Sequence, residues 1–229
     1  MIELTVPFVW LGGAMFVSAL AYCAYSYAFF WGRTLSFDAG TLPVDALLFT
    51  VFACHHSLFA RDSVRRWLSR VVPEPLLRSV YVWLASALLI AMCAAWEPIG
   101  GELYHHTGVL AALHAALQIA GVAIIGQSVR AIDGLELAGI RQASPLSDAS
   151  SLQTGGPYGW VRHPVYSGWL LLTFGAAHMT GDRLFFAGIS AAYLLIAMPL
   201  EERSLRATFG ESYAAYQRKV RYRLLPYVY

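Results

Sequence analysis

Long apolar runs, separated by short polar stretches, dominate the hydropathy pattern of the chain. Six runs can be delimited to within a few residues at each end, at about 7–31, 42–60, 79–96, 108–129, 165–180 and 184–200. Several approach the ~20 residues that a helix needs to cross the hydrocarbon of a bilayer. Only Gly181-Asp182-Arg183 separates the last two runs, which predicts a tight helical hairpin. The pattern therefore predicts an all-α integral membrane protein with about six transmembrane helices.

The composition supports this interpretation. Of the 229 residues, 58% are hydrophobic and 13% are charged, whereas an ordinary soluble domain has about 25% charged residues. A soluble fold of this length could not cover its surface with so few charges. The net charge of +2 is too small for a polyanionic partner. These values exclude a soluble globular enzyme, a disordered protein and a nucleic-acid-binding protein.

The basic residues predict an orientation in the membrane. Most of them lie in three clusters, at 61–78, 130–162 and 203–223. The positive-inside rule places all three in the cytoplasm and leaves Arg33 and Arg183 outside. With an even number of spans, both termini are then cytoplasmic. We expect a multi-pass protein of the cell (inner) membrane, in contact with membrane lipids, with its chemistry at the cytoplasmic face.

The chain is predicted to form a single membrane domain, 1–229. Four N-terminal spans occupy 1–129. The remaining part, 130–229, contains a polar loop, the two-span hairpin and a charged, aromatic tail that is expected to be largely helical up to Pro226. The hairpin and this cytosolic tail are the expected walls of a functional pocket.

A stretch rich in glycine and aromatic residues precedes the fifth run and reads GGPYGWVRHPVYSGW at 155–169. Pro164 suits the first turn of a helix, where its missing N–H group costs nothing. Arg162 and His163 would then stand at a helix N-terminus, which favours an anion such as a carboxylate or phosphate. Alternatively, the stretch is a membrane-border loop whose arginine meets lipid phosphates. The residues alone leave both interpretations open.

Two adjacent carboxylates, Glu201 and Glu202, follow the sixth run directly. Carboxylates at a membrane border are costly unless they face water, a partner or a cation. Glu202 and Arg206 could form an exposed i,i+4 pair worth only about 0.2–0.5 kcal/mol. The alternative is a site in which carboxylates and aromatic faces hold an amine or a sulfonium cation.

Taken in order, GPYGWVRHPVYSGW, EERSL, FGESYAAYQRKV and LLP, over about 153–226, resemble the C-terminal signature of the isoprenylcysteine carboxyl methyltransferase and phospholipid methyltransferase superfamily. The resemblance implies a membrane enzyme that uses S-adenosylmethionine, bound between the last two spans and the tail. It also implies a set of cofactor-binding residues: Gly156, Pro157, Tyr158, Arg162, His163, Pro164 and Tyr166, with Glu201 or Glu202 closing the site and Tyr213 and Tyr216 nearby.

The N-terminal half narrows the resemblance. HHSLFAR at 55–61, RSVY at 78–81 and ELAGIRQ at 136–142 are similar to the bacterial branch that contains methanethiol S-methyltransferases and NnrU-type membrane proteins. This implies methyl transfer to a small thiol, or to a lipophilic acceptor such as those of the isoprenylcysteine carboxyl and phospholipid methyltransferases. Two alternatives are a non-catalytic accessory protein of the NnrU type and an NADPH-dependent membrane reductase, although such reductases usually have longer chains.

A thiol acceptor must lose its proton, because the thiolate is the nucleophile and a free thiol titrates near 8.5. His56, near the cytoplasmic end of the second span, is the candidate base. Arg61 belongs to the basic face that would favour the thiolate, and Glu202 is the third candidate catalytic residue. His56 could equally be a buried, hydrogen-bonded side chain.

Metal binding is not predicted. Glu102, His105 and His106 in an outer loop could hold an ion, but a solvated loop is the simpler interpretation. His114 and His178 are single histidines in apolar surroundings, and no role is assigned to them.

Overall fold

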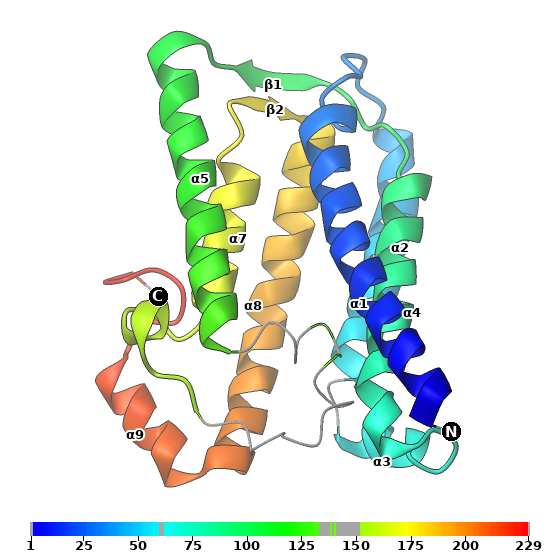
Figure 1. The fold of residues 1–229 in the computed structure, drawn as a ribbon. Coiled ribbons are helices and arrows are strands. Elements are labelled where there is room, and N and C mark those ends of the chain that lie inside the picture. The colour runs from blue at the N-terminus through cyan, green and yellow to red at the C-terminus, as the bar shows by residue number, and fades with distance from the viewer. Residues whose placement is uncertain (1, 60–61, 133–137, 139, 141–151, 229) are drawn as a thin grey trace. The chain divides into compact units, whose positions relative to one another are not determined.

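The structure, a computed structural model, describes residues 2–59, 62–132, 138, 140 and 152–228. The candidate Arg61 and most of the 136–142 motif lie outside these residues. Five described segments are long and apolar enough to cross a membrane: Val6–Phe30, Ala39–Phe59, Leu76–Ala95, Gly108–Ala131 and Gly181–Phe209. These mostly helical elements fit the predicted all-α, multi-pass membrane protein (Figure 1).

The described chain divides into two compact units. The N-terminal unit extends to Gly101 and includes Ala138 and Ile140, and the C-terminal unit begins at Glu102. Within the first unit, α1 (Ile2–Tyr25) continues as a short π-helix (Ser26–Phe30) and is followed by α2 (Leu42–Phe59), α3 (Asp62–Leu68) and α4 (Glu74–Ala95).

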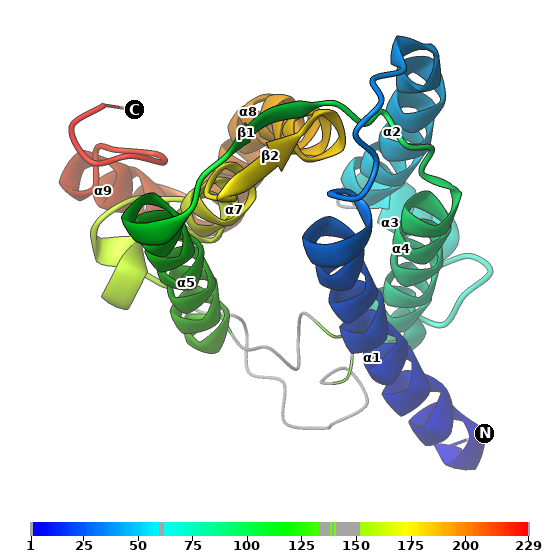
Figure 2. The ribbon, with the colours of Figure 1, turned by 90° about the horizontal axis from the view of Figure 1, so that it is seen from above.

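Helices α1 and α4 lie side by side in the N-terminal unit (Figures 1 and 2). Gly12 allows the close contact, because a Cβ atom there would stand 2.8 Å from Nε1 of Trp83. The Trp83 indole instead donates to the carbonyl oxygen of Phe8 at 3.1 Å and stacks on its ring. Many large apolar side chains elsewhere on the helices are exposed, Trp10 at 58% and Ile119 at 70% among them. That exposure is expected where lipid is the solvent.

The C-terminal unit contains β1 (Glu102–His105), α5 (Gly108–Ala131), a 3-10 turn (Gly156–Gly159), α7 (Pro164–Phe174), β2 (His178–Thr180), α8 (Gly181–Phe209) and α9 (Glu211–Lys219). Helices α5 and α7 cross closely, because Gly121 and Gly168 face each other. A Cβ atom on Gly121 would be 2.5 Å from the Gly168 carbonyl oxygen. Small residues at such crossings are typical of packed membrane helices. The strands and α9 lie at opposite ends of this unit (Figure 1).

Two local expectations about this unit differ from the structure. Helix α7 begins at Pro164 as predicted, but the turn expected at 181–183 is wrong. These residues form the first turn of α8, because the Thr180 side chain caps that helix by accepting from the Arg183 N–H group. The connection to α7 is the segment 175–180, which contains β2.

The tail is helical only to Lys219, so the helix expected up to Pro226 is too long. The backbone beyond it returns to the start of α7. There the N–H groups of Arg162 and His163 donate to the carbonyl oxygens of Tyr222 and Arg223, each at 2.9 Å. These long-range hydrogen bonds replace the helical ones that would have continued α9.

Candidate functional site

Three segments of the C-terminal unit meet near α9: the stretch from the 3-10 turn into α7, the last turns of α8, and the tail. Gly156 in the 3-10 turn has a φ of +58°, a left-handed conformation that glycine adopts readily. A Cβ atom built on Gly156 would meet no heavy atom within 4 Å. The glycine turn that carries Pro157 and Tyr158 therefore borders open space.

Arg162 connects all three segments. Its Nε donates to Oε1 of Glu202 at 2.7 Å, and both side chains are more than 90% buried. Its Nη1 donates to the carbonyl oxygens of Val220 at 2.9 Å and Arg221 at 2.7 Å. A buried ion pair recovers its desolvation cost only when further hydrogen bonds satisfy the charged groups. The two carbonyl oxygens supply such bonds and hold the tail against the start of α7.

Glu202 is the acceptor at the centre of this network. Besides Arg162, its Oε1 lies 3.3 Å from Nε2 of His163. Its Oε2 accepts from Nη2 of Arg223 at 3.2 Å and from Nε2 of Gln217 at 3.5 Å. Both oxygens of this buried carboxylate are thus occupied by partners from within the chain. We call these five side chains, Arg162, His163, Glu202, Gln217 and Arg223, the Glu202 network.

Glu201 has a different environment from its neighbour. Its side chain is 45% exposed, and Oε2 accepts a hydrogen bond from the Tyr166 hydroxyl at 2.7 Å. The same oxygen lies 3.6 Å from Nδ1 of His163, whose ring stacks on Tyr166. Consecutive helical residues point in directions about 100° apart. The fold therefore separates the two carboxylates into an internal one and an accessible one.

Tyr213 and Tyr216 lie on the buried face of α9. Together with Val220 they form a small core, on which Leu152, Leu205 and Phe209 pack. The Tyr216 hydroxyl donates to the Tyr158 carbonyl oxygen at 2.8 Å and so anchors the glycine turn to α9. Burial raises the pKa of Tyr213 to about 12, and the nearby Glu202 carboxylate adds to the shift. Burial likewise raises the pKa of Tyr158 to about 12, with a further contribution from Glu201. Both phenols are therefore protonated at neutral pH.

The structure brings the sequence-predicted cofactor residues together in one unit. Pro164 is the first residue of α7, Gly156 and Pro157 share the turn with Tyr158, and the remaining side chains are linked through the contacts above. Gln217 and Arg223 are not among the residues predicted from the sequence. Gln217 lies within the FGESYAAYQRKV motif, but Arg223 had no signal beyond its position in a charged tail.

The candidate base lies in the other unit. Nδ1 of His56, on α2, is 2.6 Å from the hydroxyl of Tyr81 on α4. His56 is exposed rather than buried, so of the two features proposed for a structural histidine only the hydrogen bond is present. Arg61 lies outside the described residues.

This arrangement offers an accessible carboxylate, protonated phenols and a glycine turn beside open space. The Glu202 network lies beside them and links the start of α7, α8 and the tail. Such a set suits a polar ligand that carries both hydroxyl or amine groups and an aromatic ring.

Comparison with known proteins gives three informative relatives. The methanethiol S-methyltransferase of Pseudomonas deceptionensis is 38% identical over 78% of this chain and 71% of its own length. Methanethiol S-methyltransferase 2 of Bradyrhizobium diazoefficiens is 36% identical over 77% of this chain and 70% of its own. The protein-S-isoprenylcysteine O-methyltransferase of Xenopus laevis is 36% identical over 32% of this chain and 27% of its own. No family model and no solved structure matches the chain.

Proposed function

The chain belongs to the methanethiol S-methyltransferase family and is a membrane methyltransferase, and on this premise we propose that it transfers the methyl group of S-adenosylmethionine to a small thiol. The accessible Glu201–Tyr166 pair, next to the open glycine turn, is the observation that carries the proposal. The relatives at 36% and 38% identity bear enzyme names, so the accessory alternative is not favoured.

The donor set fits S-adenosylmethionine. Glu201 is accessible and suits its ammonium group or ribose hydroxyls. Tyr158 and Tyr166 offer aromatic surfaces suited to the adenine ring or the sulfonium cation. We therefore propose that the glycine turn, Tyr166 and Glu201 contact the cofactor.

The remaining residues of the predicted set are proposed to act through these contacts. Arg162, His163 and Glu202 use their polar groups on one another and on the tail. Tyr213 and Tyr216 are 1% and 6% exposed, and the Tyr216 hydroxyl holds the glycine turn through the Tyr158 carbonyl oxygen. Glu202, a catalytic candidate from the sequence, is accordingly proposed as a positioning residue.

When bound, S-adenosylmethionine supplies an electrophilic methyl group, whose bond to the sulfonium breaks as its bond to the acceptor sulfur forms. The protein's task is mainly to align the two sulfur atoms and to exclude water. The Glu202 network suits this task because its hydrogen bonds join the start of α7, α8 and the tail.

The acceptor thiol must also lose its proton, and we propose His56 as the base. This role requires one tautomer of the imidazole. If Nδ1–H donates to the Tyr81 oxygen, Nε2 carries the lone pair and can accept a proton. Tyr81 would then fix the tautomer of His56.

The membrane arrangement is proposed as a single domain of six spans with both termini in the cytoplasm. Beside the five long apolar helices, the remaining span, fifth in chain order, is α7 with the segment after it. With 11 residues, α7 extends only about 16 Å. Polar side chains of α5 bind the carbonyl groups where α7 ends: Gln118 donates to Leu172 at 3.0 Å, and His114 contacts the Gly175 oxygen at 3.2 Å. Irregular backbone within a membrane requires such internal partners.

The test uses the purified full-length protein in detergent micelles, with S-adenosylmethionine and methanethiol. Headspace gas chromatography measures dimethyl sulfide, and calorimetry measures binding of S-adenosylhomocysteine. We expect both signals in the wild type and in Glu211→Gln, a control at an exposed carboxylate paired with Arg218. Binding without dimethyl sulfide would exclude methanethiol as the acceptor. Absence of both signals would refute the proposed function.

A further inference from the structure

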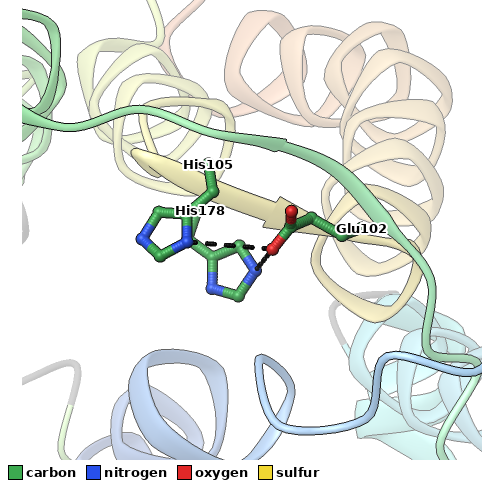
Figure 3. A group of neighbouring side chains, drawn as sticks. All are labelled: Glu102, His105 and His178. Atoms are coloured by element: carbon green, nitrogen blue, oxygen red, sulfur yellow. Dashed lines mark ion pairs between the residues drawn. The ribbon is translucent and has the colours of Figure 1, made fainter.

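Three potential metal ligands gather at the strand end of the C-terminal unit, away from the Glu202 network. Glu102 and His105 lie on β1 and His178 lies on β2, and their side chains reach toward one another on one side of the two strands (Figure 3). Oε2 of Glu102 is 3.0 Å from Nε2 of His178 and 3.8 Å from Nδ1 of His105. One nitrogen or oxygen atom from each residue lies within 4.8 Å of the other two.

An irregularity in the sheet makes this cluster possible. Alternate residues of a regular strand face opposite sides, so Glu102 and His105 would point apart. The register of β1 shifts between Glu102 and Tyr104, where an extra residue of β1 stands opposite β2. A bulge of this kind re-aims the side chains beyond it. His105 consequently turns to the side of Glu102, directly opposite its register partner His178.

The distances match those between the ligands of a transition metal. In a tetrahedral zinc site with bonds of about 2.0–2.1 Å, ligand atoms lie roughly 3.4 Å apart. The separations of 3.0 and 3.8 Å fall on either side of this value. Nε2 of His178 is buried and faces the Glu102 carboxylate at 3.0 Å. A buried nitrogen in this position is suited to a metal bond.

We propose that Glu102, His105 and His178 form a binding site for a divalent ion of the zinc class. Two imidazoles and one carboxylate suit Zn²⁺, whereas Mg²⁺ and Ca²⁺ prefer oxygen ligands. Glu102 and His105 are 43% and 55% exposed, so an ion can enter from solvent. Three protein ligands leave a fourth position for water.

Such an ion would link the segment that leads into α5 with the segment that leads into α8. Strand β1 leads into α5 and β2 leads into α8. An ion that binds the folded state and not the unfolded chain raises the stability of the fold. The site is separate from the Glu202 network, so the proposal does not depend on the methyl acceptor.

The experiment titrates Zn²⁺ into the full-length protein in detergent micelles, after chelator treatment and removal of any affinity tag. His178→Gln removes one ligand. His106→Gln is the matched control, because this neighbouring histidine contacts His114 instead of the cluster. We expect one zinc ion per chain, affinity reduced about tenfold or more in His178→Gln, and little change in the control.

A second measurement distinguishes loss of a metal ligand from misfolding of the variant. Zn²⁺ should raise the midpoint of thermal unfolding in the wild type and in His106→Gln, but not in His178→Gln. Glu102→Gln, at an exposed side chain, should weaken zinc binding in the same way if His178→Gln fails to fold. Absence of zinc binding to the wild type, or equal binding by the ligand variants, overturns the proposal.

Discussion

The two ends of the C-terminal unit each contain a contact between a histidine and a glutamate, yet they differ in what surrounds it. Near α9, His163 lies 3.3 Å from Glu202, and Arg162 and Arg223 also donate to that carboxylate. At the strands, His178 lies 3.0 Å from Glu102. There the nearby Arg183 donates to the His178 backbone oxygen instead.

This difference makes the Glu202 network a structural support and the strand end a potential binding site. Arginine provides several donors in a fixed geometry, so two arginines satisfy the Glu202 carboxylate from within the chain. Among the described residues, no arginine is recorded as a donor to Glu102, so Glu102 and His178 present atoms that can bind an ion. The same pair of residue types is therefore part of a closed hydrogen-bond network at one end and offers ligands at the other.

The largest expected effect comes from disrupting the Glu202 network. Glu202→Gln leaves Arg162 and Arg223 without their counter-charge, which should lower the free energy of unfolding by about 3–5 kcal/mol, the usual cost of breaking a buried ion pair. Chemical denaturation in micelles measures the change. The matched control is Glu102→Gln in metal-free protein, where loss of an exposed charge should cost about 0–1 kcal/mol. Equal costs at the two ends would contradict the comparison.

The accessible carboxylate should affect binding more than stability. We expect Glu201→Gln to weaken S-adenosylhomocysteine binding about 10- to 100-fold, because a charge-assisted hydrogen bond contributes about 1.5–3 kcal/mol. Calorimetry measures the affinity. Unfolding should change little, in contrast to Glu202→Gln. Unaltered affinity in Glu201→Gln would remove this residue from the proposed cofactor contacts.

His56 offers a third histidine contact for comparison, because its partner is the phenol of Tyr81 and not a carboxylate. If Tyr81 fixes the tautomer of His56, Tyr81→Phe should lower kcat severalfold, in line with loss of a hydrogen bond worth about 0.5–1.5 kcal/mol. KM for the cofactor should stay constant. His56→Gln should lower kcat further, because it removes the proposed base. Identical kcat values for wild type and His56→Gln would exclude the base role.

The smallest expected effect is on the thermal stability of the protein at alkaline pH, through Tyr213 beside the Glu202 network. Burial, with a contribution from Glu202, raises the pKa of Tyr213 to about 12 in the folded protein, above its ordinary value of 10. The unfolded chain therefore ionises first, and the associated stability is present below pH 10 and is lost as pH rises toward 12. The thermal midpoint should fall less in Tyr213→Phe than in the wild type over this range. An equal fall in both proteins would contradict the assigned cause.

Local signals in the sequence predicted the helices well, but not their ends. Apolar runs located the five long helices, and Pro164 marked the start of α7. The turn placed at 181–183 was wrong because capping by Thr180 starts α8 earlier. Helix α9 stops at Lys219 because the tail pairs with Arg162 and His163, about 60 residues earlier in the chain. Contacts between distant residues leave no local pattern.

The sequence by itself determined the membrane class and the helical content, because hydropathy is a local property of a chain, and its compact motifs supplied the residues that are proposed to surround the cofactor. Only the tertiary structure decided which carboxylate is internal, since Glu201 and Glu202 are neighbours and their difference depends on Arg162 and the returning tail. The tertiary structure also brought His178 to Glu102 and His105. A bulge and the pairing of two strands 73 residues apart made that contact, and no spacing within the sequence indicates it.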